Sequence, residues 1–114
     1  MNKLRVGICG WGNVATGLFK TLQTNSVEIK KRSNLEIEII AIGARRDNPK
    51  CDPGNVIIER DIFKIIDHDI DVIVELIGGV DVARDLILKA LNAKKPVVTA
   101  NKAVIFNHGD ELFS

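Results

Sequence analysis

One short motif restricts the possible folds of this chain more than any other feature of its sequence. Gly10-Trp11-Gly12-Asn13-Val14-Ala15 follows the apolar run Leu4–Cys9 and precedes a stretch in which apolar residues recur at a spacing of four, namely Val14, Leu18 and Leu22. The run predicts a strand, and the spacing predicts a helix. A G-x-G-x-x-A turn between a strand and a helix is typical of dinucleotide-binding units.

Each small residue of this motif has a physical role in such a unit. Gly10 allows the tight turn, Gly12 lets the backbone approach a diphosphate, and Ala15 keeps the helix close to the strand. The first turn of the helix offers N–H groups and a positive dipole end to the phosphates. We therefore predict that Gly10, Gly12, Asn13 and Val14 bind the cofactor. The alternative is a glycine-rich turn that binds no ligand.

The rest of the chain continues the alternation of strands and helices. Further strands are predicted at Leu35–Gly43, Val56–Ile58, Asp71–Ile77 and Pro96–Ala100. The first helix is expected to run on towards Lys31, a short one to cover Asp61–Ile66 with Asp61 as its cap, and a third to begin at the cap Asp81. The third helix should bury the stripe Ala83, Leu86, Ile87, Ala90 and Leu91 and pair Asp85 with Lys89 on its other face. This pattern predicts an α/β fold, a Rossmann-type doubly wound, mainly parallel sheet with helices on both faces.

The residues after the second strand indicate which nucleotide is bound. NAD-binding units usually place an acid there, but this strand ends in Gly43-Ala44-Arg45-Arg46. Because arginine forms charge-assisted hydrogen bonds with phosphate, we expect NADP(H) to be preferred over NAD(H). Arg45 is the main predicted ligand, with Arg46 and Lys50 as helpers. Two alternatives stay open: the cations are solvated loop residues, or Asp47 takes the role of the acid.

Later strand ends are expected at the same crevice. Gly78 and Gly79 follow the fourth predicted strand, where they permit close approach of backbone to cofactor. Thr99-Ala100-Asn101-Lys102 ends the fifth, so Thr99 and Lys102 are predicted cofactor contacts. Glu75 is a charge within an apolar strand and needs a partner. One interpretation is that Glu75 orients a loop or contacts a bound ligand. The other is that its carboxylate accepts hydrogen bonds from neighbouring backbone N–H groups.

Composition excludes several other classes of protein. The 114 residues fit one domain, 1–114, and 46% hydrophobic content argues against disorder. A net charge of +1 gives no sign of a nucleic-acid or membrane partner, and no signal peptide is apparent, so a cytoplasmic location is expected. Asp67-His68-Asp69-Ile70-Asp71 matches no ligand geometry, and no metal site is predicted. Cys9 and Cys51 are expected to be reduced thiols, and His108 is expected to be a surface residue.

Three stretches together resemble homoserine dehydrogenases. They are Val6–Val14, Val74–Gly79 and above all Val97-Val98-Thr99-Ala100-Asn101-Lys102-Ala103. The resemblance implies NAD(P)-dependent interconversion of homoserine and aspartate semialdehyde within threonine and methionine biosynthesis. It also implies that Gly12-Asn13-Val14 holds the diphosphate, that Arg45 is associated with NADP, and that Lys102 is a catalytic residue at the junction of cofactor and substrate.

The same resemblance predicts that this chain is a fragment. The substrate and catalytic domain, and most of the surface of the expected homodimer, would lie beyond residue 114. On this interpretation the chain binds cofactor without turnover. Two other interpretations remain: a stand-alone nucleotide-sensing module, and a different semialdehyde or amino-acid dehydrogenase with the same first domain.

Overall fold

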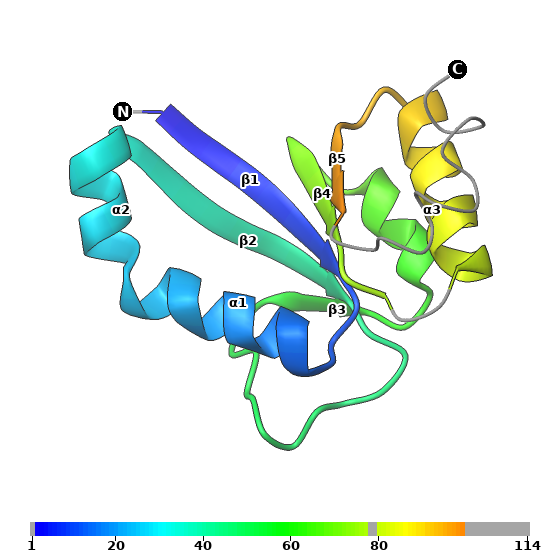
Figure 1. Cartoon of the computed structure of the whole chain (residues 1–114), viewed down its shortest axis with the longest axis horizontal. Coiled ribbons are helices and arrows are strands. Elements are labelled where there is room, and N and C mark those ends of the chain that lie inside the picture. The colour runs from blue at the N-terminus through cyan, green and yellow to red at the C-terminus, as the bar shows by residue number, and fades with distance from the viewer. Residues whose placement is uncertain (1, 78–79, 100–114) are drawn as a thin grey trace.

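A parallel five-stranded sheet forms the centre of the protein in a computed structural model that describes residues 2–77 and 80–99 (Figure 1). Its strands are β1 (Asn2–Cys9), β2 (Leu35–Gly43), β3 (Ile57–Glu59), β4 (Val72–Glu75) and β5 (Val97–Thr99), in the order β3-β2-β1-β4-β5. In the pairing of β1 with its two neighbours, Cys9 lies opposite both Gly43 and Glu75. The carboxyl ends of β1, β2 and β4 therefore lie at the same level, where a doubly wound sheet binds its ligands.

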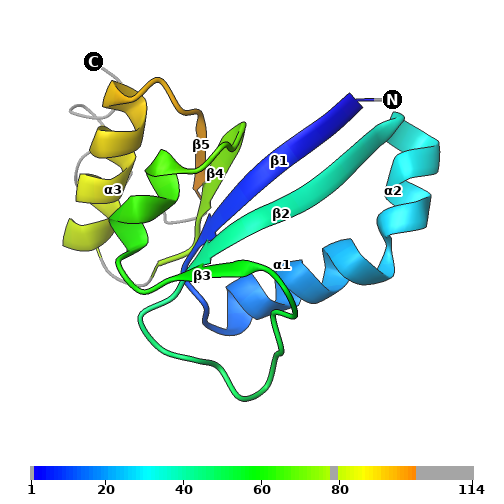
Figure 2. The same ribbon diagram turned by 180° about the vertical axis from the view of Figure 1, so that it is seen from behind.

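Helices cover both faces of this sheet, as Figures 1 and 2 show from opposite sides. On one face α1 (Asn13–Thr24) places Ala15 and Phe19 in a buried cluster with Ile8 and Ile42. On the other face the 3-10 helix η1 (Ile62–Asp67) and α3 (Asp81–Asn92) form a second cluster with the sheet, which contains Cys9, Ala41, Ile65, Ile73 and Leu86. The predicted Rossmann-type fold is confirmed.

The first helical region differs from the prediction in two ways. It does not run unbroken to Lys31 but divides at Asn25 into α1 and α2 (Ser26–Ser33). The division has a local cause, because the adjacent Asn25 and Ser26 favour helix ends over helix interiors. The apolar residues spaced by four are also less buried than their neighbours, since Val14 is 68% exposed and Leu18 half-buried, while Ala15 is fully buried.

The third helix was predicted correctly in its buried face but not in its polar contacts. Ala83, Leu86, Ile87 and Ala90 are buried, whereas Leu91 is exposed. Asp81 is the first helical residue and not the cap, which is Val80; the acid is nonetheless well placed beside the positive end of the helix dipole. Asp85 pairs with the adjacent Arg84 at 2.9 Å, and not with Lys89.

Lys89 has a different partner from the one predicted. Its Nζ lies 5.6 Å from the ring centre of Phe63 in η1, a cation–π contact between the two helices. The cap of η1 agrees with the prediction, since the Phe63 N–H donates to Asp61 Oδ1 at 3.1 Å.

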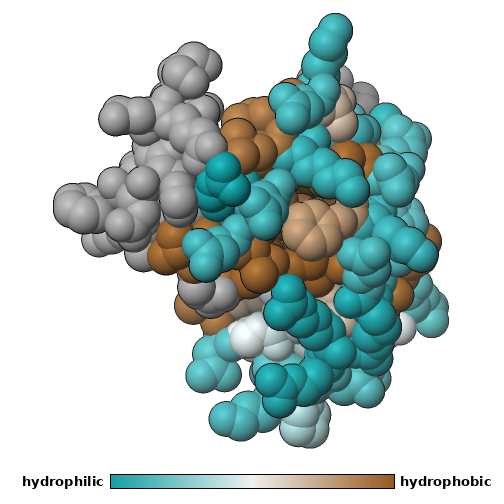
Figure 3. All heavy atoms as spheres, turned by 90° about the vertical axis from the view of Figure 1, so that its right-hand side faces the viewer, coloured by the Kyte–Doolittle hydropathy of each residue, from teal (hydrophilic) through white to brown (hydrophobic). Residues whose placement is uncertain are grey.

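Figure 3 shows the molecule from the side on which α3 lies, with a band of apolar side chains bordered by polar ones. Within residues 2–77 and 80–99, no helix combines the length and apolar character needed to cross a membrane.

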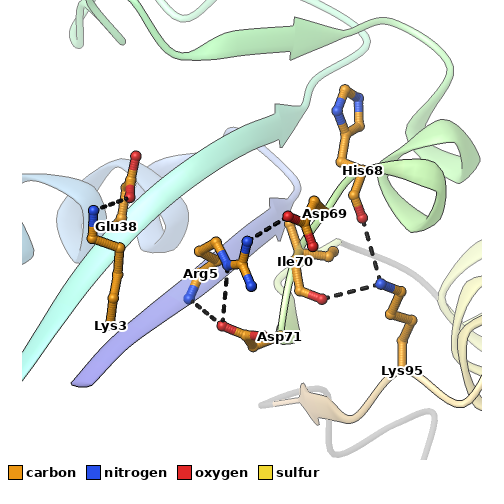
Figure 4. Close-up of polar contacts among 8 residues, drawn as sticks. All are labelled: Lys3, Arg5, Glu38, His68, Asp69, Ile70, Asp71 and Lys95. Atoms are coloured by element: carbon orange, nitrogen blue, oxygen red, sulfur yellow. Dashed lines mark hydrogen bonds and ion pairs between the residues drawn. The ribbon is translucent and has the colours of Figure 1, made fainter.

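Charged residues at the amino end of the sheet form a network of their own (Figure 4). Arg5 binds both Asp69 and Asp71, and its backbone N–H donates to Asp71 Oδ2 at 2.8 Å. The Lys95 ammonium donates to the backbone carbonyls of Ile70 at 3.1 Å and His68 at 3.5 Å. The described residues contain no group of three or more acid, histidine or cysteine side chains placed to hold a metal ion. The Asp-rich stretch thus ties β1 to the start of β4.

The Asp71 carboxylate should make stability depend on pH. The backbone N–H of Arg5 lowers the pKa of Asp71 from its ordinary 3.8, with a further contribution from the Arg5 charge. Because the pKa is depressed in the folded state, this stabilisation is present above pH 3.8 and is lost as the pH falls below it. Asp71→Asn should therefore flatten the acid side of the stability curve. Urea unfolding at about pH 6 and about pH 3 measures this, and equal pH dependence in both proteins would contradict it.

Candidate nucleotide-binding site

The turn after β1 is held by backbone bonds to both neighbouring strand ends. The Gly10 N–H donates to the Gly43 carbonyl at 2.8 Å, and the Leu76 N–H donates to the Cys9 carbonyl at 2.8 Å. Gly10 has a φ of +109°, and a Cβ built there would lie 2.7 Å from the Leu76 carbonyl oxygen. Only glycine fits this position, both for its conformation and for its closeness to the neighbouring backbone.

The start of α1 is open to a ligand. Gly12 is the N-cap residue in an extended conformation, and no side chain of the described residues caps the helix. The first helical hydrogen bond runs from the Thr16 N–H to the Gly12 carbonyl at 3.0 Å, which leaves the N–H groups of residues 13–15 without an intrahelical acceptor. A Cβ at Gly12 would meet nothing within 4 Å. Neither packing nor φ thus requires glycine here, whereas the approach of a phosphate to the backbone would.

A cavity of about 510 Å³ opens beside this helix start. Its volume falls within the usual range for small-molecule sites. Its polar lining consists of Gly10, Gly12, Arg45, Arg46, Asp47 and Asn48. Its apolar lining comes from Trp11, Ile62, Leu76 and Ile77. The cavity therefore joins the glycine turn to the loop after β2, as the prediction for a nucleotide requires.

The charges in that loop are arranged for an anion. Arg45 and Arg46 are exposed, and within the described part of the chain neither guanidinium has a hydrogen-bond or ion-pair partner. Asp47, the acid that could have bound the ribose, forms an ion pair with Arg60. Arg60 also donates to the Ala44 carbonyl at 3.2 Å. The acid is thus partly neutralised, while the two arginines are available to a phosphate.

Two residues of this site were missed by the sequence analysis. The Asn48 side chain donates to the Trp11 carbonyl at 3.2 Å, between the two glycines. The Trp11 ring is almost completely buried and packs edge-on against Phe19, with ring centres 5.3 Å apart. The Lys50 N–H donates to Asn48 Oδ1, which makes an Asx turn. Asparagine is typical of such turns, so its presence in this loop was a signal that could have identified it.

Glu75 is fully buried at the end of β4, where its carboxylate joins two strand ends. Its Oε2 accepts from the Ile77 N–H at 2.6 Å, and its Oε1 accepts from the Thr99 hydroxyl at 2.5 Å. The interpretation of Glu75 as a strand-end acid bound to a neighbouring N–H is confirmed, with a bond to β5 in addition. Burial, together with the Glu75 charge, raises the pKa of Cys9 to about 12, so this thiol stays protonated.

The predicted site residues fall into three groups. Gly10, Gly12, Arg45 and Arg46 line one cavity. Asn13 and Val14 lie exposed in the first turn of α1, next to that cavity, and Thr99 binds Glu75. Gly78, Gly79 and Lys102 lie outside the described residues, as does His108, which was predicted to be a surface residue.

Comparison with known proteins agrees with this geometry. The sequence profile of the family described as "Homoserine dehydrogenase, NAD binding domain" matches residues 10–114. The chain is 50% identical to a homoserine dehydrogenase of Pseudomonas aeruginosa over 115 aligned residues, and 41% identical to that of Methylobacillus glycogenes over 108. The alignments include all of this chain in the first case and 92% in the second, but only 26% of each relative.

Solved structures give the same result. The crystal structure of a homoserine dehydrogenase from Thiobacillus denitrificans superposes with a TM-score of 0.89 and 36% identity, over 99% of this chain and 27% of that one. A Staphylococcus aureus homoserine dehydrogenase superposes with a TM-score of 0.84 and 33% identity, over 98% of this chain and 29% of that one. This chain therefore belongs to the homoserine dehydrogenase family, as its NAD-binding domain.

Proposed function

We propose that residues 1–114 are the NAD(P)-binding domain of an enzyme that interconverts homoserine and aspartate semialdehyde by hydride transfer. The observation that supports this most directly is the uncapped start of α1 beside a cavity, within a chain of this family. The chain spans about a quarter of the length of its curated relatives, so substrate binding and the catalytic groups other than Lys102 are assigned to a further part of the protein. This chain alone should bind cofactor without turnover.

The proposal gives each part of the site a task. The turn Gly10–Gly12 and the first N–H groups of α1, those of Asn13 and Val14, hold the diphosphate. The nicotinamide, when bound, supplies or accepts the hydride, and the protein orients it. Lys102 would be the catalytic residue where cofactor and substrate meet, with Gly78, Gly79 and Thr99 as further cofactor contacts. These assignments depend on the family resemblance.

NADP(H) is the proposed preferred cofactor, with NAD(H) as the weaker one. Its support is the pair of guanidinium groups at the cavity, which have no partner among the described residues, and the ion pair of Asp47 with Arg60. A 2′-phosphate beside Arg45 and Arg46 would form charge-assisted hydrogen bonds that a ribose hydroxyl cannot match.

Arg45→Ala should separate the two nucleotides. We expect about a 10- to 100-fold loss of NADPH affinity, the equivalent of one lost hydrogen bond between charged groups, with NADH affinity changed less than about twofold. Trp11 is the only tryptophan and lines the cavity, so its fluorescence reports the titrations. Arg32→Ala, in α2, is the matched control. Tighter binding of NADH than of NADPH by the unaltered chain would contradict the assignment.

A cytoplasmic location and a homodimeric full-length enzyme belong to the same proposal. For the location, the support is that Cys9 and Cys51 are both free, as cysteines are in reducing compartments. The homodimer stays a prediction from the family resemblance.

A further inference from the structure

Asn48 links two parts of the cavity that otherwise belong to different segments of the chain. Its Nδ2 donates to the Trp11 carbonyl at 3.2 Å, and its Oδ1 accepts from the Lys50 N–H at 3.0 Å. Its own carbonyl accepts from the Cys51 N–H at 3.1 Å. One half-buried side chain thus orders the loop around itself and joins that loop to the glycine turn.

Besides the burial of Ala44 and Cys51 in the same core cluster as Trp11, the other side-chain bonds that tie the loop to the rest of the chain lead to segments other than the turn. Arg60 binds Ala44 and Asp47, and the Lys20 ammonium donates to the Lys50 carbonyl at 3.1 Å. These bonds hold the start of the loop to Arg60, which follows β3, and the loop at Lys50 to α1. Asn48 lies between them and fixes the middle of the loop against the backbone of Trp11.

The turn is the rigid partner in this link and the loop is the adaptable one. Trp11 is 9% exposed and packed against Phe19, and the turn is bonded to two strand ends. Arg45 and Arg46, by contrast, lie exposed in a loop outside regular structure. Loops of this kind have more conformational freedom than the elements they connect. A bond from the rigid turn therefore limits where the two guanidinium groups can lie.

We propose that Asn48 is a positioning residue for cofactor specificity. By holding the loop to the Trp11 carbonyl, it sets the spacing between the diphosphate site at Gly12 and the guanidinium groups of Arg45 and Arg46. A bound NADP(H) needs this spacing, because its diphosphate and its 2′-phosphate must reach Gly12 and the guanidinium groups at the same time. NAD(H) has a 2′-hydroxyl in place of the 2′-phosphate and does not depend on it. The inference rests on the proposed preference for NADP(H), and it predicts that Asn48 affects NADPH far more than NADH.

Asn48→Ser isolates this link. A serine hydroxyl can still accept from the Lys50 N–H, as in an ST turn, but is too short to reach the Trp11 carbonyl. We expect NADPH affinity to fall about tenfold and NADH affinity less than about threefold, by titration of the whole chain with each nucleotide. Asn48→Leu, which loses both side-chain bonds, should change the ratio of NADPH affinity to NADH affinity by at least as much. Asn55→Ser, at an exposed loop position away from the cavity, is the matched control.

A combined variant distinguishes this inference from the proposed function. In a chain already lacking both guanidinium groups (Arg45→Ala with Arg46→Ala), Asn48→Ser should no longer change the NADPH-to-NADH ratio. Equal losses for both nucleotides in Asn48→Ser alone would overturn the positioning role and leave Asn48 a structural residue. An unchanged ratio of NADPH to NADH affinity after removal of both arginines would overturn the assignment of the NADP(H) preference to Arg45 and Arg46.

Discussion

Gly12→Ser is expected to make the protein more stable while nearly abolishing nucleotide binding. Gly12 is the N-cap of α1, and serine is a preferred N-cap because its hydroxyl accepts a hydrogen bond from the first turn. The backbone at this position is extended, and a Cβ would meet nothing within 4 Å, so the substitution causes no strain. With lower unfolded-state entropy as well, the gain should be about 0.5–1 kcal/mol, or roughly 2–4 °C in Tm.

The same hydroxyl would occupy the N–H groups and the free space that the phosphates of a nucleotide need. It would accept from N–H groups in the first turn of α1, beside the cavity, and would fill the space that a diphosphate needs to approach the backbone. Losing two hydrogen bonds to charged oxygens corresponds to about a 100-fold loss of affinity or more. Calorimetric titration with NADPH and a thermal melt measure the two effects on one sample.

Gly17→Ser is the matched control, because Gly17 is an exposed glycine one turn further along α1 with the same free space around a new Cβ. It should also stabilise the helix but leave NADPH affinity unchanged. Should Gly12→Ser bind NADPH as tightly as the unaltered chain, the helix start would not be the diphosphate site.

The parts of the fold that follow from local rules could be predicted from the sequence. The fourth strand and the buried stripe of α3 were recognised because apolar side chains must lie on covered faces. The glycine turn was recognised because its two glycines have separate physical reasons, the backbone contact at Gly10 and the open helix start at Gly12. Arg45 and Arg46 were placed correctly at the cavity because they directly follow a strand end.

Apart from the local pair of Arg84 and Asp85, the features that escaped prediction depend on contacts between distant segments. A spacing of four placed Val14, Leu18 and Leu22 on one face of α1, but Ala15 and Phe19 are the residues buried against the sheet, with Leu18 only half-buried beside them. Asp85 has a charged residue four positions away, and yet the adjacent Arg84 is nearer. Asn48 was not identified as part of the site, because its bond to Trp11 joins residues 37 positions apart. No local pattern contains such information.

Gly10→Ala is expected to unfold the domain or to lower its stability severely. Gly10 has a φ of +109°, which side chains of L residues rarely adopt. The new Cβ would lie 2.7 Å from the oxygen and 2.8 Å from the carbon of the Leu76 carbonyl, backbone atoms that are held by the Leu76 N–H bond to Cys9. Backbone strain and overpacking together should cost at least about 3 kcal/mol, or roughly 10 °C in Tm.

Gly54→Ala separates the two causes of this loss. Gly54 also has a positive φ, +67°, but a Cβ there would meet nothing within 4 Å. It should therefore show only the conformational cost, about 1–2 kcal/mol, in the same urea unfolding experiment. If Gly10→Ala lost no more stability than Gly54→Ala, the contact with Leu76 would not be what requires glycine after β1. The fixed position of the turn Gly10–Gly12 against the end of β4 would then need a different explanation.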